Sequence, residues 1–448
     1  MAALASEGPE PSSRGAERDA QQAHTDDHVS PGDIALGVII GRTSEFFDFF
    51  VFGIASVLVF PQLVFPFVDR LTGTLWSFLL FSLAFLARPV GSVVFSAIDR
   101  RHGRGAKLTV ALFLLGTSTV LVSFLPSYAT IGWWAIAILA ICRIGQGLAL
   151  GGAWDGLASL LALNAPPGRR GWYASLPQLG APLGFLLASL LFAFFYALLS
   201  PEDFIGWGWR YPFFVAFTIN VVALFARLRL IATDEFTNLF KSRELQPVSL
   251  SELVRERGGN LVVGALVPLA SFALFHLVTV FPISWITLFT DRNAAEFLIV
   301  QAAGSIIAAG AIVCSGLVAD QIGRRTTLAI GAGLIGLFSL GSIVAPLLFG
   351  DSLAGQTIYV IVGFGLLGLS YGQAAGAVSA NFGQRYRYSG AALTSDLAWL
   401  LGAGFAPLVA LTLSSHFGLA WVGVYLLSGS ICTLAALAWS RRLRLSES

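Results

Sequence analysis

Long apolar stretches, separated by short polar clusters, fill the chain from about residue 33 to residue 440 and constrain its fold more than any other feature. A helix that rises ~1.5 Å per residue needs about 20 apolar residues to cross ~30 Å of hydrocarbon, so this region has room for about a dozen crossings. Only 12% of the 448 residues are charged and 56% are hydrophobic. Soluble domains carry about twice that charge, so the composition excludes an ordinary water-soluble enzyme. The sequence predicts an all-α polytopic membrane protein.

Clusters of charge, proline and glycine divide the apolar region into twelve expected transmembrane helices. Their ranges are 34–58, 73–98, 108–125, 131–160, 172–199, 211–230, 261–289, 295–318, 326–348, 355–380, 389–413 and 419–440. Six precede and six follow a polar segment, which predicts an N-terminal six-helix bundle over 33–230, a cytosolic middle loop over 231–260 and a C-terminal six-helix bundle over 261–440. The polar start, 1–32, lacks the apolar stretch of a secretory signal and is expected to be a disordered cytosolic tail. Residues 441–448 are expected to form a cytosolic C-terminal tail.

The placement of basic residues predicts the orientation. Loops on the side of both termini hold many arginines and lysines, whereas the opposite loops hold only Arg70, Arg210 and Arg292. Because positively charged loops stay in the cytosol, we expect both termini to be cytosolic, with lipid around the helices. The formal net charge of +2 gives no reason to expect nucleic-acid binding.

No motif indicates a cofactor or a catalytic metal. The three cysteines, Cys142, Cys314 and Cys432, are too few and too scattered for a disulfide framework or a metal site. The chain also lacks a phosphate-binding G-x-x-x-x-G-K-[ST] loop and an H-E-x-x-H motif. We therefore expect neither an enzyme nor an ATP-driven pump.

Two basic loops indicate an internal duplication. SAIDRRHGRGAK (96–107) follows the second expected helix and GLVADQIGRRTT (316–327) follows the eighth. Their Gly-Arg pairs begin 220 residues apart, at Gly103 and Gly323, as expected for a repeated six-helix unit. In each loop an Asp can pair with a neighbouring helix end while arginines anchor at the cytosolic interface. The expected gating-loop residues are Asp99, Arg104, Asp320, Gly323, Arg324 and Arg325.

The second loop resembles the signature G-x-x-x-D-R-x-G-R-R of the major facilitator superfamily. Further motifs are similar to its metabolite:proton symporter branch, which carries 2-oxoglutarate, citrate, shikimate, proline and betaine. They are GRTSEFFDFFVFG (41–53), FLARPVGSVVF (85–95), RIGQGLALGGAWDG (143–156), APPGRRG (165–171), WGWRYPFF (207–214) and RLRLIATDEF (227–236). Three positions depart from that pattern: Arg42 replaces an Asn, Ala153 replaces a Glu, and Arg100 replaces the Asp of the first loop, with Asp99 one place early.

The resemblance implies a monomeric, proton-coupled symporter of the bacterial inner membrane that takes up a small organic acid or zwitterion by alternating access. Its partners are then protons and a small carboxylate or zwitterionic metabolite. An alternative within transporters is a proton-coupled exporter or antiporter of drug-like or metabolite compounds.

Ionisable residues inside apolar spans are the first candidates for transport chemistry, since a charge in the bilayer is costly without a partner or a polar cavity. Glu45 and Asp48 are three residues apart at midplane depth, and two carboxylates that share a site could take up a proton near neutral pH. The alternative is a structural ion pair, for instance of Arg42 with Glu45. His276, mid-span, could join a proton path or be a packing residue.

Substrate-binding candidates come from both halves. Arg88 and Arg143 offer planar donor groups that suit a carboxylate, or else neutralise the acidic pair. Neutral hydrogen bonds could come from Gln146, Gln178, Tyr371 and Gln373, and Asp396 is a reserve proton site. Prolines and glycines inside 172–199 and 389–413 predict paired bends, while the phenylalanines of 46–52 are expected to serve packing.

Overall fold

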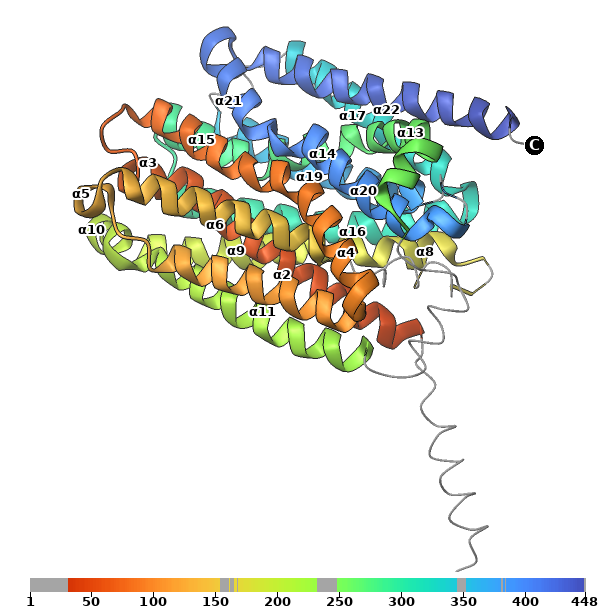
Figure 1. Cartoon of the computed structure of the whole chain (residues 1–448). Helices are drawn as coiled ribbons and strands as arrows, with labels where there is room; N and C mark the ends of the chain where they lie inside the picture. Colours follow the sequence, from red (N-terminus) through yellow and green to blue (C-terminus); the bar gives the residue numbers. More distant parts are fainter. Residues whose placement is uncertain are drawn as a thin grey trace, which may run out of the picture.

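The computed structural model describes residues 31–153, 161, 165–166, 168–231, 248–344, 352–379, 382 and 384–446. Among these residues the secondary structure is entirely helical (Figure 1). The expected tail 1–32 lies almost wholly outside the described residues, as do 232–247 of the middle loop and the last two residues of the C-terminal tail.

The N-terminal half, 31–231, contains the helices for six crossings. They are α2 (Pro31–Leu58), α3 (Phe60–Leu63), α4 (Arg70–Ser123), α5 (Tyr128–Ile131), α6 (Trp133–Gly152), α8 (Arg170–Ser175), the 3-10 turn η1 (Leu176–Leu179), α9 (Gly180–Leu198), α10 (Pro201–Asp203), the π-helical turn η2 (Phe204–Gly208) and α11 (Arg210–Ile231).

The C-terminal half, 248–446, follows the same plan. It contains α13 (Leu250–Leu266), α14 (Leu269–Val278), α15 (Val280–Phe289), α16 (Ala294–Ile322), α17 (Arg324–Val344), α19 (Leu353–Ser379), the 3-10 turn η3 (Gln384–Tyr386), α20 (Arg387–Trp399), the π-helical turn η4 (Leu400–Gly404), α21 (Ala406–Phe417) and α22 (Ala420–Ser446).

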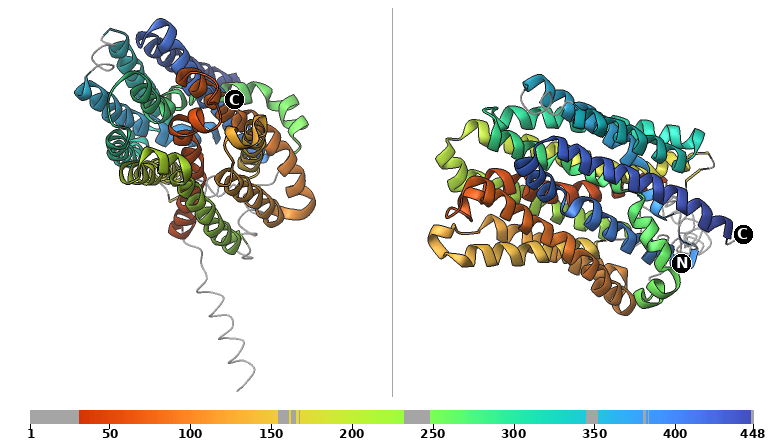
Figure 2. Two further views of the ribbon diagram at one scale, coloured as in Figure 1. Left: turned by 90° about the vertical axis from the view of Figure 1, so that its left-hand side faces the viewer. Right: turned by 90° about the horizontal axis from the view of Figure 1, so that it is seen from above.

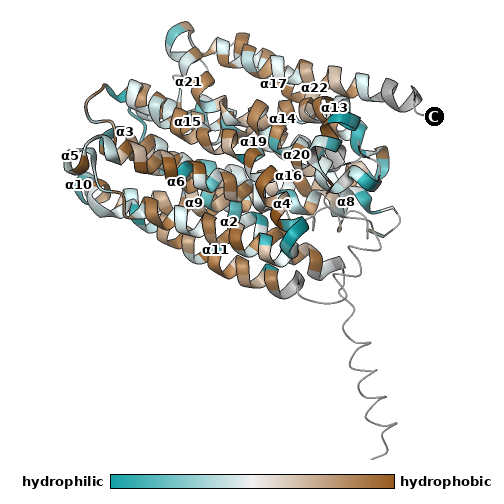
Figure 3. Cartoon of the chain, viewed as in Figure 1, coloured by the Kyte–Doolittle hydropathy of each residue, from teal (hydrophilic) through white to brown (hydrophobic). Residues whose placement is uncertain are grey.

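In the described part of the chain, ten helical segments are long and apolar enough to cross a membrane. One of them is α4, whose 54 residues make two crossings because they bend at Gly103. The twelfth is α2, 28 residues long, whose interior holds Arg42, Glu45 and Asp48. The twelve-helix expectation is therefore confirmed. Many large apolar side chains are exposed, as a lipid-facing surface requires. Hydrophobic residues recur along the long helices (Figure 3).

An even number of crossings brings the start of α2 and the end of α22 to the same end of the bundle, here called the terminal side (Figure 2). The opposite end, with α5, α10 and the turn between α21 and α22, is called the far side (Figure 1).

Gly103 and Gly323 show the duplication in the backbone. Their φ angles are +84° and +87°, in the region that favours glycine, and each reverses the chain between two long helices. Sequence reasoning placed a loop at 96–107, but helix continues up to and directly after Gly103. One residue with positive φ is therefore enough for the turn.

The middle segment also differs from the expected polar loop. Part of it forms α13, which is kinked at Arg257 and packs on the start of α20. Glu252 contacts Arg385 at 2.7 Å, and Ser389 accepts a hydrogen bond from the backbone N–H of Val248 at 2.9 Å. These contacts fasten the segment to the C-terminal half.

The helix type changes at both places where the sequence predicts paired bends. The 3-10 turn η1 interrupts the fifth crossing and the π-helical turn η4 interrupts the eleventh, beside Pro177 and Pro407 respectively. Both interruptions lie next to the central pocket described below. They leave irregular backbone where the two halves meet.

Candidate functional site

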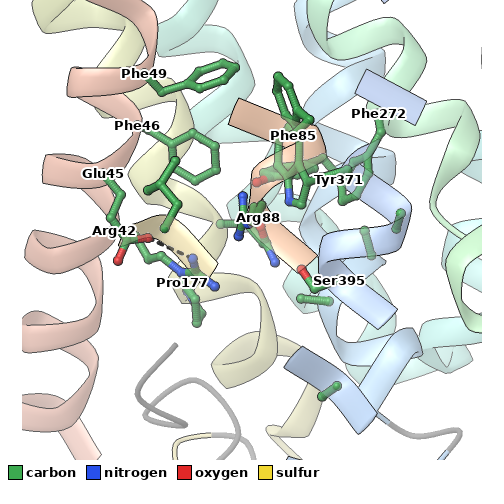
Figure 4. Close-up of a pocket in the computed structure, with 17 residues that line it drawn as sticks. Arg42, Glu45, Phe46, Phe49, Phe85, Arg88, Pro177, Phe272, Tyr371 and Ser395 are labelled. Carbon is green, nitrogen blue, oxygen red and sulfur yellow. Dashed lines mark hydrogen bonds and ion pairs between the residues drawn. The ribbon is translucent and has the colours of Figure 1, made fainter. Parts of the chain in front are cut away.

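A central pocket lies between the two halves, with an empty volume of about 830 Å³ that includes open space at its mouth (Figure 4). It is lined by Arg42, Glu45, Phe46, Phe49, Phe85, Arg88, Leu150, Pro177, Gln178, Phe272, Tyr371, Ala374, Ala375, Ala391, Ser395, Ala398 and Trp399. Aromatic rings make up much of this wall and both halves contribute them. A change in the relative position of the halves therefore changes the pocket.

Arg88 connects the two halves at the pocket wall. Its Nε donates to Asp396 Oδ1 at 2.6 Å, across 308 residues of sequence, and Ser92 Oγ donates to the other oxygen of the same carboxylate. The two terminal nitrogens of Arg88 make no hydrogen bond to any described residue. A planar pair of N–H donors at a pocket wall is suited to bind a carboxylate through two parallel hydrogen bonds.

Three further candidate donors line the pocket. They are the amide of Gln178 and the hydroxyls of Tyr371 and Ser395. Together with Arg88 they form a small polar set in an otherwise aromatic wall. Gln178 and Tyr371 were sequence candidates, whereas Ser395 was not, because a lone serine in an apolar span carries no signal.

Glu45 is held by two arginines. Arg42 Nη1 lies 2.9 Å from one carboxylate oxygen and Arg227 Nη2 lies 2.8 Å from the other. Arg227 reaches this position because Gly41 has no side chain: a Cβ there would lie 2.2 Å from Arg227 Nε. Sequence reasoning did not single out Arg227, which the structure buries against Glu45 of α2.

Asp48 faces a different neighbourhood. Thr119 Oγ1 donates to it at 2.5 Å, Gln146 Nε2 donates to the same Thr119 oxygen at 3.0 Å, and Arg143 Nη1 donates to Gln146 Oε1 at 3.1 Å. The expectation that Glu45 and Asp48 share one site is therefore wrong. Residues three apart on a helix differ by about 60° in direction, and here each carboxylate finds its own partners.

Arg143 is completely buried outside the pocket wall. Its Nε donates to the Phe81 carbonyl at 3.1 Å, and its guanidinium lies 4.2 Å from the ring centre of Phe52 and 5.4 Å from that of Phe49. Arg143 and Gln146 thus belong to the series of hydrogen bonds that leads through Thr119 to Asp48, and they do not line the pocket. Gln373 is also buried outside the pocket wall. For these three residues the structure offers no direct contact with a substrate in the pocket.

His276 is enclosed by rings. Its imidazole centre lies 5.5 Å from the ring centres of both Phe49 and Phe81, and its Nε2 has no hydrogen-bond partner among the described residues. Phe49 and Phe81 also contact Arg143, so they separate His276 from that guanidinium. Contrary to the packing expectation for the phenylalanines of 46–52, Phe46 and Phe49 belong to the pocket wall.

The loop aspartates join the halves on the terminal side. Asp320 accepts hydrogen bonds from the backbone N–H groups of Gly171 and Trp172, at 2.6 and 3.2 Å, at the start of α8 in the other half. The expected pairing of this Asp with a helix end is thus present. Nearby, Arg325 donates to the Leu437 carbonyl of α22.

Asp99 makes a weaker connection between the halves. It pairs with Lys107 of its own helix at 3.3 Å and accepts a hydrogen bond from the Tyr388 hydroxyl of α20 at 3.2 Å. Arg104 lies over the Tyr388 ring, 5.2 Å from its centre. The one-residue displacement of this Asp replaces the helix-end contact seen at Asp320 by a side-chain contact.

Comparison with known proteins places the chain in a family. The model of the Major Facilitator Superfamily matches residues 44–401. The chain is 37% identical over 422 residues to the inner membrane metabolite transport protein YhjE of Escherichia coli strain K12, covering 93% of this chain and 95% of that protein. It is 32% identical to the shikimate transporter of the same organism, covering 90% and 92%.

The fold is similar to that of solved transporters. The crystal structure of a D-xylose-proton symporter superposes with a TM-score of 0.67 at 18% identity, over 90% of this chain and 96% of that chain. At this identity the likeness concerns the fold alone. The chain belongs to the major facilitator superfamily, in its metabolite:proton symporter branch, and is a multi-pass membrane transporter rather than an enzyme.

Proposed function

We propose that this protein takes up a small organic acid or zwitterionic metabolite together with protons, by alternating access. The observation that carries the substrate class is the pair of terminal nitrogens of Arg88, which have no hydrogen-bond partner among the described residues at the wall of the central pocket. Aromatic rings on the other walls suit the carbon frame of a metabolite, and Gln178, Tyr371 and Ser395 supply neutral hydrogen bonds.

Alternating access is supported by contacts between the halves on both sides of the pocket. On the terminal side, Asp320 holds α8 and Asp396 holds Arg88. Toward the far side, aromatic contacts cross between the halves, such as Phe50 with Phe275 at 5.4 Å between ring centres. If the two halves rock about the pocket, one set of contacts breaks while the other remains.

Proton coupling is assigned to Asp48. Of the sequence candidates, Glu45 is held between two arginines and His276 has only aromatic surroundings and one hydroxyl, Thr279, 3.5 Å from its Nδ1. Asp48 accepts a hydrogen bond from a neutral hydroxyl and is linked through Gln146 to Arg143. Because Arg143 packs on Phe49, and Phe49 lines the pocket, a charge change at Asp48 has a physical route to the substrate site.

For orientation, we propose that the terminal side is cytosolic, as the arginine bias requires, and that the protein resides in the bacterial inner membrane as a monomer. The relative named above as an inner membrane protein supports this location.

The test uses purified protein in sealed proteoliposomes with an external pH indicator. Carboxylates and betaines are added one at a time under an imposed proton gradient, and the substrate is expected to move protons in the same direction as itself. Arg88→Gln should remove this response. Proton movement opposite to the substrate would instead favour the exporter or antiporter alternative, and substrate flux without proton movement would refute the proposal.

A further inference from the structure

Asp396 has a hydrogen-bond environment that fits both its ionised and its protonated form. The Ser92 hydroxyl lies between Asp396 Oδ2 and the Gly151 carbonyl, whose oxygen is 3.2 Å from Ser92 Oγ. When the carboxylate is ionised, Ser92 donates to it. When it is protonated, Asp396 can donate to Ser92 Oγ and the serine can donate to Gly151, so no buried group loses its partner in either state.

The only ionised partner that contacts Asp396 among the described residues is Arg88. Arg42 of α2 and Tyr371 of α19 line the same pocket as Arg88. From α4, Asp99 and Lys107 face Tyr388, two turns away along α20. From α13, Glu252 and Glu256 face Tyr386 in η3, before the start of α20. From α14, His276 lies behind Phe85, and η4 contributes no titratable side chain.

We propose that Asp396 is a second proton-binding carboxyl and that its protonation unlocks the terminal side. The carboxylate of Asp396 gains one proton from the solution, and no other covalent bond is made or broken. Arg88 keeps its charge but loses its ionised partner, so the bridge between α4 and α20 weakens. The whole guanidinium then becomes available to a substrate carboxylate. This inference rests on the proposed function and extends it. The ionised Asp396 binds the Arg88 guanidinium, and the substrate carboxylate can take its place once Asp396 is protonated.

The geometry also explains why this release would be directional. Along α4, Arg88 and Ser92 lie on the terminal side of Phe85, which belongs to the aromatic wall, and Asp99 lies further toward the bend. Weakening the bridge therefore loosens contacts between the halves only on the terminal side. The aromatic contacts toward the far side do not involve Asp396.

The test measures opening without substrate and without a gradient. Spin labels are placed at exposed positions on the terminal side of each half, by His102→Cys in α4 and Arg255→Cys in α13, after replacement of the three native cysteines. Double electron–electron resonance then gives the ratio of the wide to the narrow distance. From mildly alkaline to mildly acidic buffer this ratio should rise about tenfold in the parent.

In Asp396→Asn the wide distance should predominate at both pH values. The matched control is Asp320→Asn, which also removes a carboxylate between the halves on this side: it should raise the ratio but retain its pH dependence. Ser92→Ala, as a second variant, removes the hydroxyl that donates to the ionised carboxylate and should move the midpoint of the pH response to higher pH, because the hydrogen bond to the ionised form is the stronger one.

An unchanged pH response in Asp396→Asn overturns the inference. If that variant does not fold, an unmoved midpoint in Ser92→Ala overturns it instead. Neither result bears on the proposed function, because proton-driven transport coupled by Asp48 is measured separately in proteoliposomes. Conversely, a lack of proton-driven flux would refute the proposed function while leaving the distance measurements to decide on Asp396.

Discussion

Replacing Asp320 with asparagine should open the terminal side of the transporter. The carboxylate accepts two backbone hydrogen bonds at the start of α8, from Gly171 and Trp172. A hydrogen bond to a charged group contributes about 1.5–3 kcal/mol, whereas a neutral one contributes about 1 kcal/mol. Asparagine can keep one neutral bond to these donors, so the closed arrangement should lose about 2–5 kcal/mol.

Since about 1.4 kcal/mol corresponds to a factor of ten, the ratio of open to closed molecules should rise at least about thirtyfold and at most several thousandfold. The spin-label pair at His102 and Arg255 reports this ratio directly. Transport should fall as well, because the arrangement open to the far side is then rarely populated.

Asp99→Asn is the matched control, since it makes the same chemical change in the other copy of the repeat. Its charged partner, Lys107, belongs to the same helix, and only the Tyr388 hydroxyl crosses to the other half. The change from a charged to a neutral acceptor at this one bond costs about 0.5–2 kcal/mol, so we expect a smaller shift, of about two- to thirtyfold. Equal shifts in both variants, or no shift in Asp320→Asn, would refute the reasoning that the helix-end contact holds this side closed.

Four further predictions concern charges and orientation. Asp48→Asn should abolish gradient-driven accumulation while exchange persists, because an amide mimics the protonated acid but cannot release a proton; intact accumulation would exclude Asp48 as the coupling site. Glu45→Gln should reduce the yield of folded protein in size-exclusion chromatography, since Arg42 and Arg227 lose a buried carboxylate; a normal yield would show that their burial does not depend on it. Arg143→Lys should lower the melting temperature by several degrees through loss of its bonds to Phe81 and Gln146, yet change apparent substrate affinity less than about threefold; a larger affinity loss would place Arg143 in direct contact with substrate. In sealed cells, an impermeant thiol reagent should label Ser352→Cys but not His102→Cys, and the reverse pattern would overturn the orientation.

Much of the architecture follows from the sequence because it depends on local composition. A run of about 20 apolar residues has few alternatives to a membrane-spanning helix. A glycine followed by arginine between two such runs indicates a tight turn, and its recurrence at 220 residues indicates the duplication. The family also follows, because its loop and helix motifs lie in contiguous segments.

The partners of the buried charges follow only from the tertiary structure. Glu45 and Asp48 read as a pair along the sequence, yet one contacts two arginines and the other a threonine. Arg88 and Asp396 are separated by 308 residues and nothing in either local segment predicts their contact. The rotation of each helix about its axis depends on close approaches such as that of Arg227 to Gly41, and these involve the whole bundle. Hydropathy therefore determines that a helix crosses the membrane, whereas packing between helices decides which neighbour each polar side chain faces.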